Sequence, residues 1–332
     1  MNEYNGFYSR IVVDKFITYA NKMIERYGDR VKKWISFNEQ NGIALEGHKI
    51  AYGAICPEGV NEESFINQLI HNSLYAHAKV VEKVHTIKDA IVLGMVIYIP
   101  HYAATCHPLD ELAARKQMSK TNVFLDMFVY GEYSSYYWSQ MVKNNTLPDI
   151  QEGDLEVMRK NTVDWLSFSY YMSATAKDGS SGVKAGGNLQ VELNPYLKAS
   201  EWGWTIDPIG IRVALRDLYE KYRMPIMVVE NGFGMRDIFE NGTVIDDERI
   251  YYMKDHIEQI GIAIEEGVDC RGYLMWGPID ILSSQGEMGK RYGMIYVNRD
   301  DKDLKDMKRY KKKSFNWYQK VIQTNAKDIE ID

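Results

Sequence analysis

The chain has 332 residues, of which 45% are hydrophobic, and it carries a formal net charge of −6 at pH 7. This length suits one large α/β domain, and the acidic balance excludes a surface that attracts nucleic acid or an anionic membrane as a whole. Its 3 widely spaced cysteines exclude a disulfide framework and are typical of a reducing compartment. The sequence contains neither an apolar run of about 18 residues nor the apolar core of a signal peptide, so we expect a cytoplasmic protein without a membrane span.

Helical and strand patterns alternate along the chain. Apolar spacing predicts helices over 11–27, 64–86, most of 110–142, 207–222, 247–265 and 307–324. Apolar runs predict strands at 34–38, 91–99, 163–171, 225–230 and 271–276, and a Gly/Ser-rich loop is expected at 178–188. The alternation predicts an α/β fold with a parallel sheet, which fits both a doubly wound sheet and a (β/α)8 barrel. No G-x-G-x-x-G or P-loop motif is present, which weakens the nucleotide-binding doubly wound alternative.

Two of the predicted strands stop at a glutamate. Glu39 follows Asn38 at the end of the first strand, and Glu230 precedes Asn231 at the end of a strongly apolar one. A barrel enzyme displays its functional side chains at the carboxyl ends of its strands. Glycoside hydrolysis needs two carboxyl groups that face each other across one bond. For either glutamate taken alone, a solvated loop carboxylate is the alternative interpretation.

The segments around these glutamates resemble those of the family 1 glycoside hydrolases. WISFNEQ resembles the acid/base segment of that family, and VVENGFG resembles its nucleophile segment. The resemblance extends over nearly the whole chain, through YNGFYSRIVVDKF, VDWLSFSYY, RGYLMWGPIDILS and GKRYGMIYV. It implies an incomplete (β/α)8 TIM barrel with about strands four to eight and their helices, so that residues 1–332 form one partial catalytic barrel.

The resemblance also assigns catalytic roles to individual residues. It implies that Glu39 is the acid/base and that Glu230 is the nucleophile of a retaining hydrolase. Asn38 would hold the sugar 2-hydroxyl, Tyr171 would donate a hydrogen bond to the nucleophile, and Trp276 would lie under the glycone ring. For Tyr171 and Trp276, packing in the core is the alternative interpretation.

A second pattern concerns the substrate. Where common members of the family have Glu-Trp, this chain has Ser283 and Ser284, followed by Lys290 and Tyr292. A glutamate would repel a phosphate, whereas Ser, Lys and Tyr offer two hydroxyl donors and a cation. The set Ser283, Lys290 and Tyr292 resembles the 6-phosphate pocket of the 6-phospho-β-glycosidases. Ser284 replaces a Trp that is typical of members preferring 6-phosphogalactosides, and this favours 6-phosphoglucosides.

We therefore expect a retaining hydrolase of 6-phospho-β-D-glucosides that acts on a small phosphosugar and has no nucleic-acid or membrane partner. A 6-phospho-β-galactosidase and a β-glucosidase are the enzymatic alternatives. No organic cofactor is implied. No metal is expected either, because His101, Cys106 and His107 lack a fourth ligand at a metal-binding spacing.

The N-terminal part of the family pattern has no counterpart in this chain. The strands that end at Glu39 and Trp276 should then each lack a neighbour, which leaves two open sheet edges and part of the apolar barrel interior exposed. Our hypothesis is a truncated product. An alternative of another class is a non-catalytic remnant, or one half of a split barrel that associates with a separately encoded N-terminal segment. A homo-oligomer is also compatible with the sequence.

Overall fold

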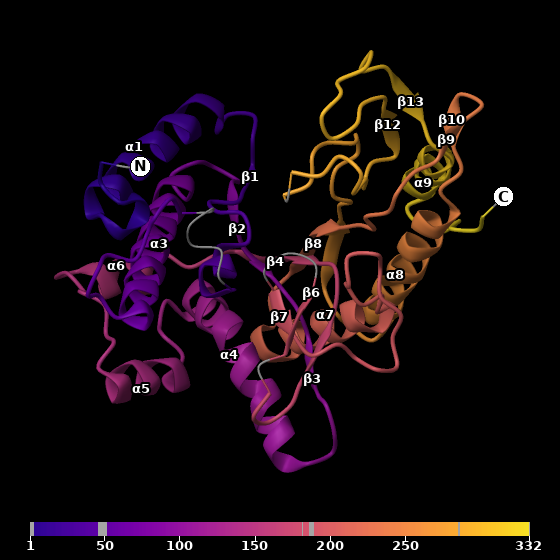
Figure 1. Ribbon diagram of the computed structural model, residues 1–332. Helices are drawn as coiled ribbons and strands as arrows, with labels where there is room; N and C mark the ends of the chain where they lie inside the picture. Colours follow the sequence, from indigo (N-terminus) through magenta and orange to yellow (C-terminus); the bar gives the residue numbers. More distant parts are fainter. Residues whose placement is uncertain (1–2, 46–51, 181, 186–188, 285, 332) are drawn as a thin grey trace. The chain divides into compact units, whose positions relative to one another are not determined.

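The computed structural model describes residues 3–45, 52–180, 182–185, 189–284 and 286–331. Its main sheet is 5-stranded, in the order β1-β2-β4-β8-β11. These strands are Lys33–Trp34, Ile91–Ile97, Trp165–Tyr170, Ile226–Asn231 and Cys270–Tyr273 (Figure 1). Their order in the sheet follows their order in the chain without a reversal, as in a β/α barrel and unlike a doubly wound sheet. The predicted α/β fold, a parallel sheet forming part of a barrel, is confirmed.

The helices follow the predicted pattern closely. They are α1 (Arg10–Tyr27), α3 (Glu62–Val84), α4 (Pro108–Tyr130), α5 (Ser135–Asn144), α6 (Asp154–Lys160), α7 (Pro208–Tyr222), α8 (Asp247–Glu265) and α9 (Lys313–Gln323), with short 3-10 helices at Gly6–Tyr8 and Gln40–Leu45. Local chemistry sets their ends. Asn61 accepts a hydrogen bond from the backbone N–H of Ser64 at 3.1 Å and so caps α3. Gly131, with φ 67°, ends α4 and divides the predicted helical stretch 110–142 into two helices.

The first of two compact units comprises Met1–Ser169, Ala176–Asp178 and Tyr222–Met227. Its strand β2 is buried along almost its whole length, as expected for a parallel strand that is covered on both faces. Helix α3 packs against α1 and α6 (Figure 1). Arg10 and His71 bind the two carboxylate oxygens of Asp154 at 2.6 and 3.0 Å, and this ionic contact links the three helices.

The second unit comprises Tyr170–Thr175, Gly179–Lys221 and Val228–Asp332. Its apolar core contains Phe233, Ile250, Tyr252, Met253, Ile257, Met294, Trp317 and Val321. Strand β12 (Ile295–Val297) pairs antiparallel with β13 (Arg309–Lys311). Helix α9 packs against α8 within this unit, so the C-terminal segment is part of its core (Figure 1).

The two end strands of the main sheet are β1 and β11, as the sequence predicts. Strands β2 and β4 are almost fully buried, whereas β1 and β11 carry only exposed and half-buried residues. Directly after these strands, Ile35 is 39% exposed and Leu274 is 49% exposed. The ends of the sheet therefore present apolar side chains of the kind that the central strands bury.

Three predicted boundaries are wrong. The strand expected at 34–38 is limited to β1, because the chain turns before Glu39, whose φ is 42°. The last helix begins at Lys313 rather than near 307, because residues 309–311 pair in β13. Part of the loop expected at 178–188 is a hairpin of β6 (Val183–Ala185) and β7 (Leu189–Val191), while residues 181 and 186–188 lie outside the described residues.

Several short elements were not predicted. They are α6 and the strands β3 (His101–Ala103), β5 (Ala174–Ala176), β9 (Phe239–Glu240) and β10 (Thr243–Val244), together with β12. Strands this short lack a readable alternation of apolar and polar residues. Their pairing depends on partners that the fold brings close, so local propensity does not reveal them.

Candidate active site

Glu39 belongs to the first unit, and its Oε1 accepts a hydrogen bond from the hydroxyl of Ser169. Burial raises the pKa of Glu39, and the hydrogen bond from Ser169 opposes this rise. A carboxyl group that stays protonated near neutral pH can give its proton to a leaving oxygen. The neighbouring Asn38 is exposed.

The backbone at Glu39 is left-handed, with φ 42°. For a residue other than glycine this conformation costs on the order of 1 kcal/mol, and such positions gather at functional sites. Asn41 fixes the segment that follows Glu39. The side-chain amide of Asn41 donates to the Ile97 carbonyl at 2.9 Å and accepts from the Ile97 N–H at 2.8 Å. Gln40 also donates to the Ser73 hydroxyl at 3.2 Å. Asn41 was not predicted as a site residue, and only the polar run after an apolar strand marks it in the sequence.

Glu230 belongs to the second unit and lies next to the last residue of β8. The hydroxyl of Tyr171 donates a hydrogen bond to Glu230 Oε2 at 2.9 Å. A donor at this distance favours the ionised carboxylate, which is the form that a nucleophile needs. Asn231 anchors the end of the strand, because its Nδ2 donates to the Tyr170 carbonyl at 2.7 Å and its Oδ1 accepts from the Tyr273 hydroxyl at 2.8 Å.

Trp276 and Tyr292 lie beside this strand end. The backbone N–H of Trp276 donates to the carbonyl of Asn231 at 2.9 Å. The ring of Trp276 meets that of Tyr292 edge-on, with centroids 4.9 Å apart. Tyr171 also contacts Tyr292, with ring centroids 6.2 Å apart. Aromatic faces of this kind suit the apolar side of a sugar ring.

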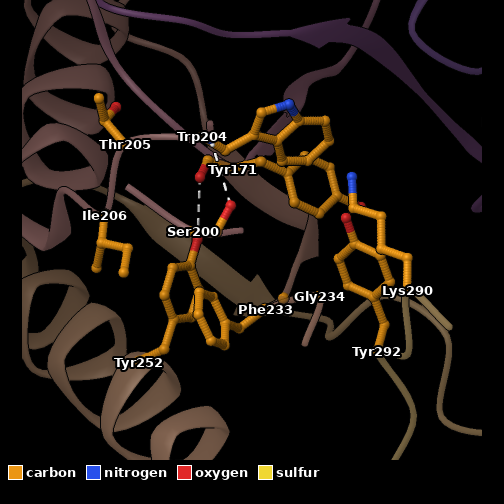
Figure 2. A pocket seen from close by; sticks show the side chains of 11 residues that line it. Tyr171, Ser200, Trp204, Thr205, Ile206, Phe233, Gly234, Tyr252, Lys290 and Tyr292 are labelled. Carbon is orange, nitrogen blue, oxygen red and sulfur yellow. Dashed lines mark hydrogen bonds between the residues drawn. The ribbon is translucent and has the colours of Figure 1, made fainter. Parts of the chain in front are cut away.

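Lys290 lies in an aromatic pocket next to these residues. Figure 2 shows the pocket, which is lined by Tyr171, Trp204, Phe233, Tyr252 and Tyr292 among others. The Lys290 ammonium lies 3.8 Å from the centre of the Trp204 ring and 5.7 Å from that of Tyr292. Lys290 is only 4% exposed, and it forms no ion pair with another residue in the described part of the chain. Burial lowers the pKa of its ammonium to about 8, although Glu287 opposes this shift.

Ser283 lies in the turn that leads to Lys290. Its backbone N–H donates to the Glu287 carbonyl at 2.9 Å, and its hydroxyl oxygen accepts from the Glu287 N–H at 3.2 Å. Ser283 is buried, whereas Ser284 is exposed. The turn is therefore closed by the same hydroxyl that the sequence singles out.

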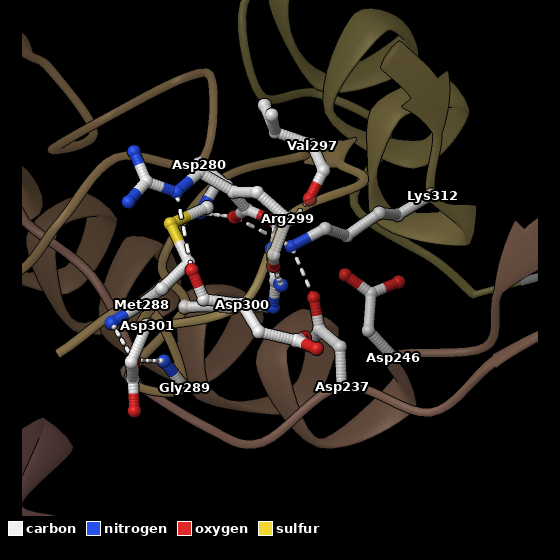
Figure 3. Close-up of polar contacts among 12 residues, drawn as sticks. Asp237, Asp246, Asp280, Met288, Gly289, Val297, Arg299, Asp300, Asp301 and Lys312 are labelled. Carbon is white, nitrogen blue, oxygen red and sulfur yellow. Dashed lines mark hydrogen bonds and ion pairs between the residues drawn. The ribbon is translucent and has the colours of Figure 1, made fainter. Parts of the chain in front are cut away.

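A buried ionic network supports the segment that carries Lys290 and Tyr292 (Figure 3). The residue between them, Arg291, pairs with Asp280 at 2.9 Å and donates to the carbonyls of Val297 and Arg299 at 3.0 and 2.6 Å. Lys312 also binds Asp280, at 2.8 Å. The network continues through three more buried side chains, Arg249, Asp237 and Asp246. On the exposed side, Asp301 Oδ1 accepts the backbone N–H groups of Met288 and Gly289.

The structure therefore places six of the eight predicted site residues in one unit. The second unit holds Tyr171, Glu230, Trp276, Ser283, Lys290 and Tyr292, and contacts link Glu230 through Tyr171 to Tyr292 and Lys290. Asn38 and Glu39 belong to the first unit. Trp204, which lines the pocket, and Trp202, whose ring centre lies 5.3 Å from the Lys290 ammonium, were not predicted. Nothing in the WGW segment distinguishes them from core residues until the fold sets them over Lys290.

No group of three or more His, Cys, Asp or Glu side chains that could hold a metal ion occurs among the described residues. His101 and His107 make local contacts instead, with the Ile99 carbonyl at 2.8 Å and the Leu109 N–H at 3.2 Å. None of the helices in the described ranges combines the length and the apolar character that a membrane span requires.

Comparison with known proteins finds a matching family and several similar glycosidases. The model of the glycosyl hydrolase family 1 matches residues 1–327. The aryl-phospho-beta-D-glucosidase BglA of Bacillus subtilis (strain 168) is 42% identical, over 98% of this chain and 71% of that protein. The 6-phospho-beta-glucosidase of Clostridium longisporum is also 42% identical, over 99% of this chain and 71% of that protein. The 6-phospho-beta-galactosidase of Clostridium acetobutylicum is 34% identical, over 93% of this chain and 69% of that protein.

Solved structures of glycosidases are also similar to this chain. The β-glucosidase from Thermotoga maritima in complex with glucoimidazole superposes with a TM-score of 0.79 at 30% identity. The match covers 96% of this chain and 70% of that chain. The present chain thus spans about 70% of the length of the proteins that it resembles.

Proposed function

The chain belongs to glycosyl hydrolase family 1, and on this basis we propose that it is a retaining hydrolase of 6-phospho-β-D-glucosides. The observation that carries the substrate class is Lys290. A lysine that is 4% exposed and has no ion pair with another described residue is an uncompensated buried cation. Such a cation gains from an anionic ligand that enters the pocket. The phospho-beta-glucosidases among the relatives support the same substrate class.

In the proposed reaction Glu230 is the nucleophile and Glu39 is the acid/base. The Glu230 carboxylate attacks the anomeric carbon, the bond to the leaving oxygen breaks, and Glu39 gives its proton to that oxygen. Glu39 then takes a proton from water, the water oxygen attacks the same carbon, and Glu230 is released as a carboxylate. The raised pKa of Glu39 and the hydrogen bond from Tyr171 to Glu230 support this division of roles.

Substrate binding is assigned to the remaining residues. Asn38 holds the 2-hydroxyl of the sugar, and Trp276 lies under the glycone ring. Ser283, Lys290 and Tyr292 bind the 6-phosphate. The exposed Ser284 stands where members that prefer 6-phosphogalactosides typically have a Trp. We therefore assign the gluco configuration to the sugar of the substrate.

The proposal includes a compartment and a state of assembly. Sugars that are phosphorylated during uptake are found in the cytoplasm, so we place the reaction there. We propose that residues 1–332 form one partial catalytic barrel, and that the exposed sheet ends at β1 and β11 are covered by an N-terminal segment or by another copy of the chain. Purification of the chain as a soluble monomer that unfolds in a two-state transition would contradict the proposal that these sheet ends are covered.

The alternative of another class is a protein that binds phosphosugars without catalysis. The enzymatic alternatives are a 6-phospho-β-galactosidase and a β-glucosidase, each of which has a relative among the comparisons.

The test is hydrolysis of nitrophenyl β-glucoside 6-phosphate by the purified chain, beside the galactoside 6-phosphate and the unphosphorylated glucoside. We expect turnover of the phosphorylated glucoside alone, and its loss in Glu230→Ala. Equal rates in Glu230→Ala would refute the catalytic assignment. Equal rates on both glucosides would refute the phosphate pocket. Binding of the phosphosugar without turnover would favour the non-catalytic alternative.

A further inference from the structure

Two opposite charges on the loop after β11 do not pair. Glu287 and Lys290 are separated by only two residues, yet they form no ion pair, and among the described residues neither finds another ionic partner. The carboxylate of Glu287 instead accepts a hydrogen bond from the indole N–H of Trp202 at 2.9 Å. The ammonium of Lys290 lies against the Trp204 ring at 3.8 Å. A buried ammonium without a counter-ion is costly, so a nearby carboxylate should pair with it unless something restrains that carboxylate.

Trp202 contacts both of these charges. Its ring centre lies 5.3 Å from the Lys290 ammonium, while its N–H holds Glu287. The backbone of Glu287 is fixed as well, through the two hydrogen bonds to Ser283. Among the described residues, the indole N–H of Trp202 is the one donor to the Glu287 carboxylate itself.

Two further charges near Trp202, those of Arg236 and Glu201, pair with each other. The guanidinium of Arg236 lies 5.4 Å from the ring centre of Trp202 and donates to Glu201 at 2.9 Å. Glu201 is thus occupied by a cation of its own. Glu287 is then the carboxylate on this loop that could neutralise Lys290, and it would compete with a phosphate for the same ammonium.

We propose that Trp202 is a positioning residue that holds Glu287 away from Lys290 and so keeps this cation available to an anionic ligand. The inference rests on the proposed function, in which that ligand is the 6-phosphate of the sugar. Trp202 would then contribute to the specificity of the site for an anionic ligand, because its hydrogen bond to Glu287 is needed only if Lys290 has to bind an anion.

The proposal predicts that variants of Trp202, Glu287 and Glu201 change phosphosugar binding differently. Trp202→Phe keeps an aromatic ring but removes the N–H, so Glu287 is released and pairs with Lys290. A partly exposed ion pair of this kind should weaken binding of a phosphosugar roughly fivefold. Glu287→Gln removes the competing charge, so the double variant Trp202→Phe/Glu287→Gln should bind as tightly as the wild type or more tightly. Glu201→Gln removes a carboxylate that pairs with Arg236 rather than with Trp202, and it should change binding by less than about twofold.

The experiment is calorimetric titration of the wild type and these variants with glucose 6-phosphate and with glucose, which needs no turnover. A wild type that binds both sugars equally would overturn the proposed function, and this inference with it. Tighter binding of glucose 6-phosphate by the wild type, together with unchanged binding in Trp202→Phe, would overturn the inference alone. Equal weakening in the single and double variants would also overturn it, because the ring rather than Glu287 would then be responsible.

A second measurement is independent of any ligand. Pairing with Glu287 should raise the pKa of Lys290, which can be followed by carbon-13 NMR of its ε-methylene group. We expect a higher pKa of Lys290 in Trp202→Phe and a return toward the wild-type pKa in the double variant. The same pKa of Lys290 in all three proteins would contradict the proposed competition.

Discussion

The affinity for phosphosugars should fall steeply between pH 7 and pH 9, because Lys290 loses its charge in this range. Burial against Trp204 lowers the pKa of Lys290 to about 8, whereas an ordinary lysine stays charged throughout the interval. A lowered lysine pKa means that the cation is present below pH 8 and is lost above it. The phosphate monoester has its second pKa near 6, so it remains a dianion over the same interval.

The size of the effect follows from the fraction of Lys290 that is charged. Roughly nine-tenths of the side chain is protonated one unit below its pKa, and roughly one-tenth one unit above it. If only the ammonium form binds the phosphate, the dissociation constant should rise about tenfold from pH 7 to pH 9. Tyr292 does not contribute in this range, because burial raises the pKa of its hydroxyl further above the ordinary value.

The assay is calorimetric titration with glucose 6-phosphate at pH 7, 8 and 9, with glucose as the uncharged reference. Lys290→Arg is the matched control, because a guanidinium stays protonated at all three pH values. We expect a steep pH dependence in the wild type and a flat one in Lys290→Arg. A flat dependence in the wild type, or the same slope in both proteins, would refute the assignment of this effect to Lys290.

Three other predictions concern single side chains. Ser169→Ala removes the hydrogen bond that opposes the raised pKa of Glu39, so this pKa should rise further; carbon-13 NMR titration of the Glu39 carboxyl measures it, and a fall would contradict the reasoning. Asp301→Ala frees the N–H groups of the turn before Lys290 and should weaken glucose 6-phosphate binding roughly fivefold; Asp303→Ala, whose carboxylate accepts from the Lys305 N–H instead, should leave binding unchanged. Burial would raise the pKa of Asp154, but hydrogen bonds from His71 and Arg10 outweigh it and hold the pKa at about 2; its contribution to stability is therefore present above pH 4 and is lost as the pH falls through 2. Asp154→Asn should lower the free energy of unfolding at pH 7 by about 2 kcal/mol, and urea unfolding of the two proteins at pH 7 and pH 3 would show whether the difference shrinks in acid.

Much of the architecture could be predicted from the sequence, because it depends on local periodicity. The alternation of helices and strands predicts a parallel sheet, and the parallel pairing of β1 with β2 and of β2 with β4 confirms it. The expectation that the strands near Glu39 and Trp276 are the ends of the sheet is confirmed as well. The short strands escaped prediction because each is stabilised by a partner that is not visible in its own residues.

Some features of the candidate site could likewise be predicted from the sequence, and others could not. Glu39, Glu230, Ser283, Lys290 and Tyr292 could be named from the sequence, because each lies in a motif whose residue types match the chemistry. Their catalytic and binding roles remain proposals. The left-handed backbone at Glu39 had no signal in the sequence. Asn41, which supports this segment, is marked there only by the polar run after an apolar strand.

The sequence by itself determined which chemical groups this protein has and the order in which its strands present them, because composition and periodicity are local properties. Only the tertiary structure decided the state of those groups. Lys290 is an ordinary lysine until Trp204, which comes from a distant segment, covers its ammonium and lowers its pKa. Glu287 is an ordinary surface carboxylate until Trp202 binds it. Burial and contacts between distant residues set the charge and position of a side chain, and these depend on the folded chain as a whole.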